Sequence, residues 1–135
     1  MVGQRPLKPL IGVRIPVGQL MKIYVAGKNL ERARVVMKAL QNEGHKITYD
    51  WVALIEGGPT REKAIAEAEA VRTADILVYL WEDDQESARY EAGMAMGLEK
   101  PIVVSGKPDA FFFQLPNVHC VESDEQIVQT VEDLI

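Results

Sequence analysis

The sequence predicts a single doubly wound α/β domain, in which helices cover both faces of a five-stranded parallel sheet. Two observations support this fold class. Short apolar runs rich in β-branched residues alternate with longer segments of helical periodicity across residues 21–135. Short loops join these segments, which favours right-handed crossovers between parallel strands.

The first half of the chain contains two strands and two helices. KIYVA at residues 22–26 is the first expected strand, and residues 29–44 are expected to form a helix. The second strand is expected at residues 46–51, KITYDW, and Thr60 is placed to cap a helix that extends to about residue 72. The expected apolar face of the first helix consists of Leu30, Ala33, Val36, Met37 and Leu40.

The second half contains the segment with the strongest strand signal. DILVYL at residues 75–80 is the most hydrophobic short run, so we expect it to be the central strand, buried on both faces. A third helix is expected at about residues 86–98, and strands at residues 101–105 and 117–121. A closing helix is expected to begin after Ser123.

This order of elements is typical of flavodoxin-like and Rossmann-like folds. In such sheets ligands bind at the carboxyl ends of the strands, near the point where the strand order reverses. The loops at residues 27–29 and 81–87, together with the start of the third helix, are therefore the expected site.

Residues 1–20 are expected to be an extension to the domain at residues 21–135. They contain three prolines and three glycines without a steady period, and Met21 precedes the first clear strand. They also lack the continuous apolar core of a signal peptide. Translation from an upstream start and an arm that packs on a partner subunit both fit this pattern.

The composition excludes several classes of protein. Apolar residues make up 47% of the chain and charged residues 26%, and no apolar run approaches the roughly 20 residues of a membrane span. A net charge of −5 argues against a surface for nucleic-acid polymers. The single cysteine, Cys120, has no internal disulfide partner, so a reducing, cytoplasmic location is expected. No Cys or His spacing resembles a zinc site.

Glu91 is the first candidate for a catalytic residue. It lies in the early turns of the third helix among small residues, in the segment SARYEAGMAMG, and these leave room for a ligand. The helix macrodipole is expected to hold the carboxylate ionised and ready to act as a nucleophile. A surface glutamate beside a tightly packed helix is the alternative.

Other acidic side chains are candidate partners of Glu91. Glu67, on the second helix, is a second carboxylate of the kind that glycoside chemistry uses as an acid/base, although a solvated helix face explains it equally. Asp83 and Asp84 follow the central strand and either bind sugar hydroxyls or are ordinary loop acids.

The turn after the first strand does not match a nucleotide-cofactor motif. The AGKN sequence has one glycine, at Gly27, which excludes the G-x-G-x-x-G fingerprint, and no acidic cluster suits a magnesium site. Lys28 and Arg32 either meet a phosphate or face solvent. His45 and His119 are isolated and are expected to be structural.

Three segments resemble the nucleoside 2-deoxyribosyltransferase family, which includes 2'-deoxynucleoside 5'-monophosphate N-glycosidases. They are KIYVAG, TADILVYL and YEAGMAMGLEKPIVV, and the resemblance spans about residues 22–134. It implies that Glu91 is the nucleophile, that Tyr24 orients it, and that Glu67 stands where the family usually has an aspartate acid. Where the family commonly has a glycine-rich turn, this chain has Ser87, Ala88 and Arg89.

The resemblance implies cleavage or exchange of the N-glycosidic bond of a 2'-deoxynucleoside or its 5'-monophosphate, through a covalent deoxyribosyl-glutamate intermediate. Gly27, Lys28, Asp83, Ser87 and Arg89 are the expected substrate-binding residues. No cofactor or metal is implied, and a homodimer or larger homo-oligomer is expected. The alternatives are a non-catalytic nucleotide-binding module and an inactive scaffold in which Arg89 pairs with Glu91.

Overall fold

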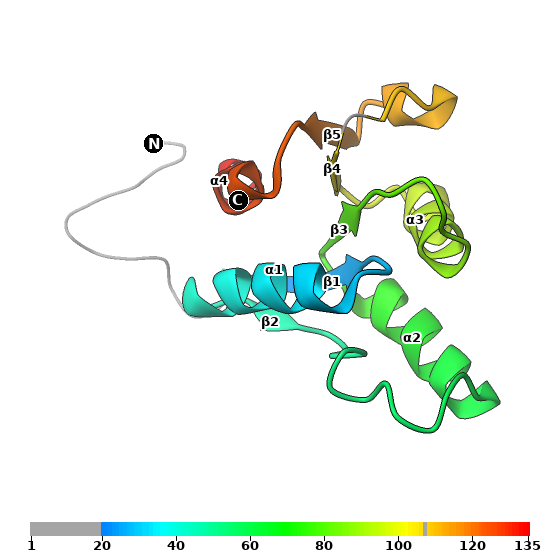
Figure 1. Ribbon diagram of the computed structural model, residues 1–135. Helices are drawn as coiled ribbons and strands as arrows, with labels where there is room; N and C mark the ends of the chain where they lie inside the picture. Colours follow the sequence, from blue (N-terminus) through cyan, green and yellow to red (C-terminus); the bar gives the residue numbers. More distant parts are fainter. Residues whose placement is uncertain (1–19, 107) are drawn as a thin grey trace.

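The computed structural model describes residues 20–106 and 108–135, and it confirms the expected fold class (Figure 1). A five-stranded sheet has the order β2-β1-β3-β4-β5, and every neighbouring pair of strands is parallel. The strands are β1 (Lys22–Ala26), β2 (Lys46–Ile47), β3 (Ile76–Leu80), β4 (Ile102–Ser105) and β5 (Val118–Val121). All five residues of β3 are buried, so the expected central strand is confirmed.

Four α-helices cover the sheet, two on each face (Figure 1). One face is covered by α1 and α4, and the other by α2 and α3. The helices are α1 (Leu30–Asn42), α2 (Arg61–Thr73), α3 (Ser87–Gly97) and α4 (Ile127–Asp133), with the short 3₁₀ helices η2 (Phe111–Gln114) and η3 (Asp124–Gln126).

The alternation of side chains along β1 sends Tyr24 to the face that carries α2 and α3. Ile23 and Val25 pack beneath α1 and α4, whereas Tyr24 and Ala26 pack against the opposite helices. Small buried residues on α3, among them Ala88 and Ala92, bring that helix close to the sheet. The strand order reverses between β1 and β3, which places the expected ligand-binding edge at their carboxyl ends.

The second strand is shorter than expected, because Trp51 completes the edge of the sheet with its side chain. The strand ends at Ile47, although Thr48 still donates its N–H to the carbonyl of Ile23 at 2.9 Å. The chain then bends, and the indole Nε1 of Trp51 donates to the carbonyl of Val25 at 2.7 Å. Trp51 therefore satisfies a backbone acceptor of β1 that a longer β2 would otherwise pair.

Two further expectations differ from the structure in detail. The closing helix begins as η3, where Ser123 and Gln126 form a capping box, and it becomes α-helical only at Ile127. Leu30 is 43% exposed and lies outside the core, because it stands in the first turn of α1 at the open edge of the sheet. The expected cap of α2 is present, with Lys63 N–H donating to Thr60 Oγ1 at 3.2 Å.

His45 is buried, in agreement with a structural role. Its Nδ1 accepts a hydrogen bond from the backbone N–H of Met21, and its Nε2 lies 2.7 Å from Glu132 Oε2. Since an N–H can only donate, the proton of a neutral His45 ring resides on Nε2. Leu20 is the one residue of the expected extension that the structure describes; residues 1–19 lie outside the described part of the chain. Among the residues described, no helix combines the length and apolar character needed to cross a bilayer.

Candidate active site

Tyr24, Glu67 and Glu91 come together from three different elements. Tyr24 rises from β1, Glu67 lies on α2 and Glu91 on α3. The Tyr24 hydroxyl donates to Glu91 Oε2 at 2.9 Å and lies 3.5 Å from Glu67 Oε1. Glu91 is only 7% exposed, so the alternative of a surface glutamate is wrong.

Glu91 does not have the ionisation state expected from the helix dipole alone. Burial, followed by hydrogen bonding with Glu67, raises the pKa of Glu91 to about 8, while the hydrogen bond from Tyr24 acts in the opposite direction. Desolvation therefore outweighs the hydrogen bond from the Tyr24 hydroxyl. The raised pKa favours the protonated form of Glu91 at neutral pH.

Tyr24 remains a hydrogen-bond donor across the physiological pH range. Its burial, together with the neighbouring charges of Glu91 and Glu67, raises the pKa of the phenol above its ordinary value. A phenol has one proton to donate, and the shorter contact goes to Glu91 Oε2. The hydrogen bond therefore holds Oε2 in place.

The three side chains line a cleft of about 270 Å³ at the carboxyl ends of the central strands. Leu30 of α1, together with Trp51 and Ile55 of the loop between β2 and α2, supplies the apolar lining. The remaining lining residues are Tyr24, Gly27, Lys28, Glu67, Gln85, Glu86, Ser87, Ala88 and Glu91. An apolar wall with a few converging polar groups is typical of a small-molecule site.

The cleft includes some of the expected substrate-binding residues and leaves out others. Gly27, Lys28 and Ser87 line it, whereas Asp83 and Arg89 do not. The guanidinium of Arg89 turns back to the loop before α3, where it donates to the carbonyls of Gln85 at 2.7 Å and Asp83 at 2.9 Å. An arrangement in which Arg89 pairs with Glu91 and fills the site is therefore not the one observed.

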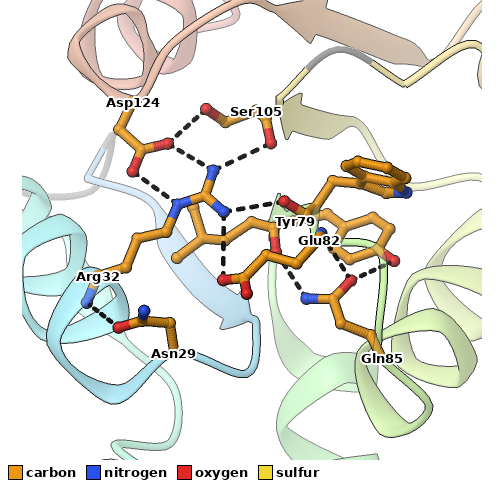
Figure 2. Close-up of polar contacts among 9 residues, drawn as sticks. Asn29, Arg32, Tyr79, Glu82, Gln85, Ser105 and Asp124 are labelled. Atoms are coloured by element: carbon orange, nitrogen blue, oxygen red, sulfur yellow. Dashed lines mark hydrogen bonds and ion pairs between the residues drawn. The ribbon is translucent and has the colours of Figure 1, made fainter.

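Arg32 neither faces solvent nor points to the cleft, in contrast to both expectations (Figure 2). Its Nε and Nη2 each lie 2.8 Å from a carboxylate oxygen of Asp124. Nη1 donates to the carbonyl of Trp81 at 2.9 Å and contacts Glu82, and Nη2 also donates to the carbonyl of Ser105. These contacts use all five donors of the guanidinium, so Arg32 joins α1 to the carboxyl ends of β3 and β4.

Gln85 is a lining residue that the sequence did not indicate. Its Oε1 accepts from the Tyr79 hydroxyl at 2.9 Å and from the N–H of Glu82 at 3.0 Å, while its Nε2 donates to the carbonyl of Leu80 (Figure 2). A backbone donor and a backbone acceptor together settle the orientation of the amide. Nothing in the sequence distinguishes this buried glutamine from the acidic loop residues around it.

Lys28 and Asp84 form an ion pair at the mouth of the cleft. Lys28 Nζ lies 3.0 Å from Asp84 Oδ2, with both side chains more than half exposed. Hydrogen bonding to Lys28 holds the pKa of Asp84 below its ordinary value. Among the residues described, no group of three or more His, Cys, Asp or Glu side chains is arranged to hold a metal ion.

We expect Glu91→Gln to stabilise the protein at alkaline pH. The pKa of Glu91 in the folded state lies above its ordinary value of 4.5, so the stability linked to its protonation is present at low pH and is lost as the pH rises through about 8. A neutral glutamine avoids this loss, because its carbonyl can accept from Tyr24 and its amide can donate to Glu67. Urea denaturation should show a gain of about 1–3 kcal/mol at pH 9 and a smaller gain at pH 5. An equal difference at both pH values would contradict the assignment of a raised pKa.

Comparison with known proteins gives matches among solved structures alone. No protein-family model and no curated protein matches the sequence. The structure of the CMP N-glycosidase BcmB of Clostridium botulinum superposes with a TM-score of 0.62 at 13% identity, over 84% of this chain and 99% of that one. The chain shares the fold of an N-glycosidase. A conserved protein of Enterococcus faecalis V583 superposes with a TM-score of 0.54 at 15% identity, over 86% of this chain and 99% of that one.

The N-glycosidase fold agrees with the resemblance drawn from the sequence. That resemblance implied a doubly wound domain of the kind found in nucleotide N-glycosidases, and at the level of the fold it is confirmed. At these identities the likeness concerns the fold, and the chemistry depends on the side chains in the cleft.

Proposed function

We propose that this protein cleaves or exchanges the N-glycosidic bond of a nucleoside or nucleotide. The observation that carries the proposal is the buried Glu91 carboxyl, hydrogen-bonded by Tyr24 and joined by Glu67, in a cleft at the carboxyl ends of β1 and β3. A structural neighbour with this fold is an N-glycosidase, which supports the same reaction class. A purely nucleotide-binding module has no need of a buried carboxyl group with a second carboxyl group beside it.

The proposed reaction uses the two carboxyl groups in different protonation states. On substrate binding the proton of Glu91 passes to Glu67, so that Glu91 is ionised and attacks C1' of the sugar. The bond from C1' to the base nitrogen breaks, a bond from C1' to Glu91 forms, and Glu67 gives its proton to the departing base. Water or a second base then attacks C1' from the side opposite to Glu91. The bond from C1' to Glu91 breaks and restores the Glu91 carboxylate, Glu67 accepts the proton of the attacking group, and the configuration is retained overall.

The sugar is proposed to be 2'-deoxyribose, and this part of the proposal rests on the sequence resemblance. The structural neighbour is named for its action on CMP, a ribonucleotide. The experiment that tests the function is therefore a chromatographic assay of base release and base exchange with ribo- and deoxyribonucleosides and their monophosphates. Release of a free base from any member of this panel by purified protein supports the proposal, and release from none overturns it.

We also propose that the protein forms a homo-oligomer and acts in the cytoplasm. Two aromatic side chains of η2, Phe111 and Phe112, are 77% and 61% exposed and pack edge to face, with ring centroids 5.1 Å apart. Phe113 instead turns inward and packs against Tyr79. An exposed aromatic pair of this kind is typical of a protein contact, and the exposed free thiol of Cys120 fits a reducing compartment.

Replacement of both exposed aromatics should weaken self-association. We expect the Phe111→Ser/Phe112→Ser variant to elute with the mass of a monomer in light-scattering chromatography, at concentrations where the wild type elutes as a dimer or larger species. Val35→Ser removes an exposed apolar side chain from α1 and serves as the control. A wild type that is already monomeric, or a double variant of unchanged mass, would rule out this contact.

A further inference from the structure

We propose that the site selects the uncharged nucleoside over its 5'-monophosphate, and that Glu86 is the residue that disfavours the phosphate. The inference deepens the proposed glycosidase function and rests on it. It differs from the activity for which the structural neighbour is named, since CMP carries a phosphate.

The lining of the cleft has an excess of negative charge. Three carboxyl groups, those of Glu67, Glu86 and Glu91, face a single cation, Lys28. Protonation of Glu91 removes one of these charges, but Glu86 is exposed, and none of the ion pairs among the described residues includes it. At neutral pH the cleft therefore offers an anion no net attraction.

The nearby cations of the described chain are already engaged. All five donors of Arg32 bind protein oxygens, and Arg89 binds the carbonyls of the loop that precedes α3. Lys63 donates to the carbonyls of Glu56 and Gly58. Lys28 can leave its exposed partner Asp84 at little cost, but the Asp84 carboxylate then remains at the same mouth, so the local charge does not become positive.

The expected pose of the sugar brings its 5' end to Glu86. Glu91 must lie beneath C1', and Glu67 must reach the base, which places the base on the α2 side against Trp51 and Ile55. The sugar then extends along α3 toward its first turn. One helical turn is about 5.4 Å, which is comparable to the span of a furanose from C1' to C5', and one turn before Glu91 the cleft is lined by Ala88, Ser87 and Glu86.

A free 5'-hydroxyl suits this end of the cleft better than a phosphate does. The Ser87 hydroxyl can donate to or accept from a hydroxyl group, and the Glu86 carboxylate can accept a hydrogen bond from one. The positive end of the α3 dipole would favour an anion, but the carboxylate of Glu86, the N-cap residue, already supplies a negative charge there. A dianionic phosphate would have to approach this carboxylate in a partly enclosed space.

Glu86→Gln tests the inference because it removes the charge and keeps the size of the side chain. The side chain makes no capping hydrogen bond to α3, so the substitution removes no such bond from the helix. The measurement is kcat/KM for the nucleoside and the 5'-monophosphate of the base that the wild type releases fastest. We expect the wild type to favour the nucleoside by roughly tenfold or more in kcat/KM, and the variant to shift the ratio of the two kcat/KM values toward the monophosphate by roughly tenfold.

Two controls separate a charge effect from other causes. Glu62→Gln removes an acidic residue from the first turn of α2, outside the lining of the cleft, and should leave the preference unchanged. Higher ionic strength should reduce the preference of the wild type for the nucleoside over the monophosphate, because salt screens the repulsion between Glu86 and the phosphate. The same change should have less effect on Glu86→Gln.

The outcomes distinguish this inference from the glycosidase proposal itself. A wild type that prefers the monophosphate, or a Glu86→Gln variant with an unchanged preference, would overturn the role of Glu86 and leave the glycosidase proposal standing. Absence of base release from every substrate would overturn the glycosidase proposal. In that event, calorimetric titration of Glu91→Gln still compares the affinity for each nucleoside of the panel with the affinity for its monophosphate. Tighter binding of a nucleoside than of its monophosphate supports the inference, and equal or weaker binding overturns it.

Discussion

Glu91→Gln should abolish base release and base exchange while the protein stays folded. An amide neither attacks C1' effectively nor forms the glycosyl ester, so the proposed covalent route is closed, and we expect kcat to fall by about 10³-fold or more. The fold should persist because the introduced amide can accept the hydrogen bond from Tyr24 and donate one to Glu67. The measurement is chromatographic detection of free base with the fastest substrate of the panel, beside circular dichroism of the same sample.

The matched control for this substitution lies on α2. Glu69→Gln makes the same chemical change at an exposed glutamate that pairs with Arg72 outside the cleft, and its activity should equal that of the wild type. Glu91→Ala adds a second test, because azide can occupy the space of the lost carboxylate and attack C1' from the same face. Appearance of a glycosyl azide would support attack from the Glu91 side. A Glu91→Gln variant that retains more than roughly a tenth of the wild-type rate would exclude Glu91 as the nucleophile.

Arg32→Met should lower the free energy of unfolding by about 2–3 kcal/mol. The arginine side chain is 22% exposed, and its loss leaves the carboxylate of Asp124 and the carbonyls of Trp81 and Ser105 without their charged donor. Methionine replaces much of the apolar stem, so the effect reports the lost polar contacts. Lysine should not restore stability, because an ammonium group cannot reproduce the two parallel bonds to Asp124. Urea denaturation of the three proteins at pH 7 gives the comparison.

Arg34→Met is the control for this loss of stability. Arg34 lies on the same helix and pairs with Glu31, but both side chains are more than half exposed, so the substitution should cost no more than about 0.5 kcal/mol. Similar losses for Arg32→Met and Arg34→Met would show that the cluster around Arg32 contributes no more than an ordinary surface ion pair.

Most of the secondary structure follows from patterns within short segments. The uniformly apolar ILVYL predicts a strand buried on both faces, and Thr60 predicts the start of α2, because both signals depend on neighbouring residues. The second strand was predicted too long because Trp51 continues the apolar pattern. Its indole instead donates to the carbonyl of Val25, and a contact between residues so far apart in the sequence cannot be predicted from a local pattern.

The sequence by itself determined the doubly wound fold and the position of Glu91 near the start of a helix at the ligand-binding edge. The resemblance predicted that Tyr24, 67 residues earlier, orients Glu91, and the structure supplies the hydrogen bond by which the two are joined. Only the tertiary structure decided that Arg32 binds Asp124, 92 residues later, instead of a ligand. Helical and strand periodicities act over a few residues, whereas these contacts depend on how the crossovers bring distant elements together. Burial in the assembled cleft also raises the pKa of Glu91, and the residues around it in the sequence do not indicate that burial.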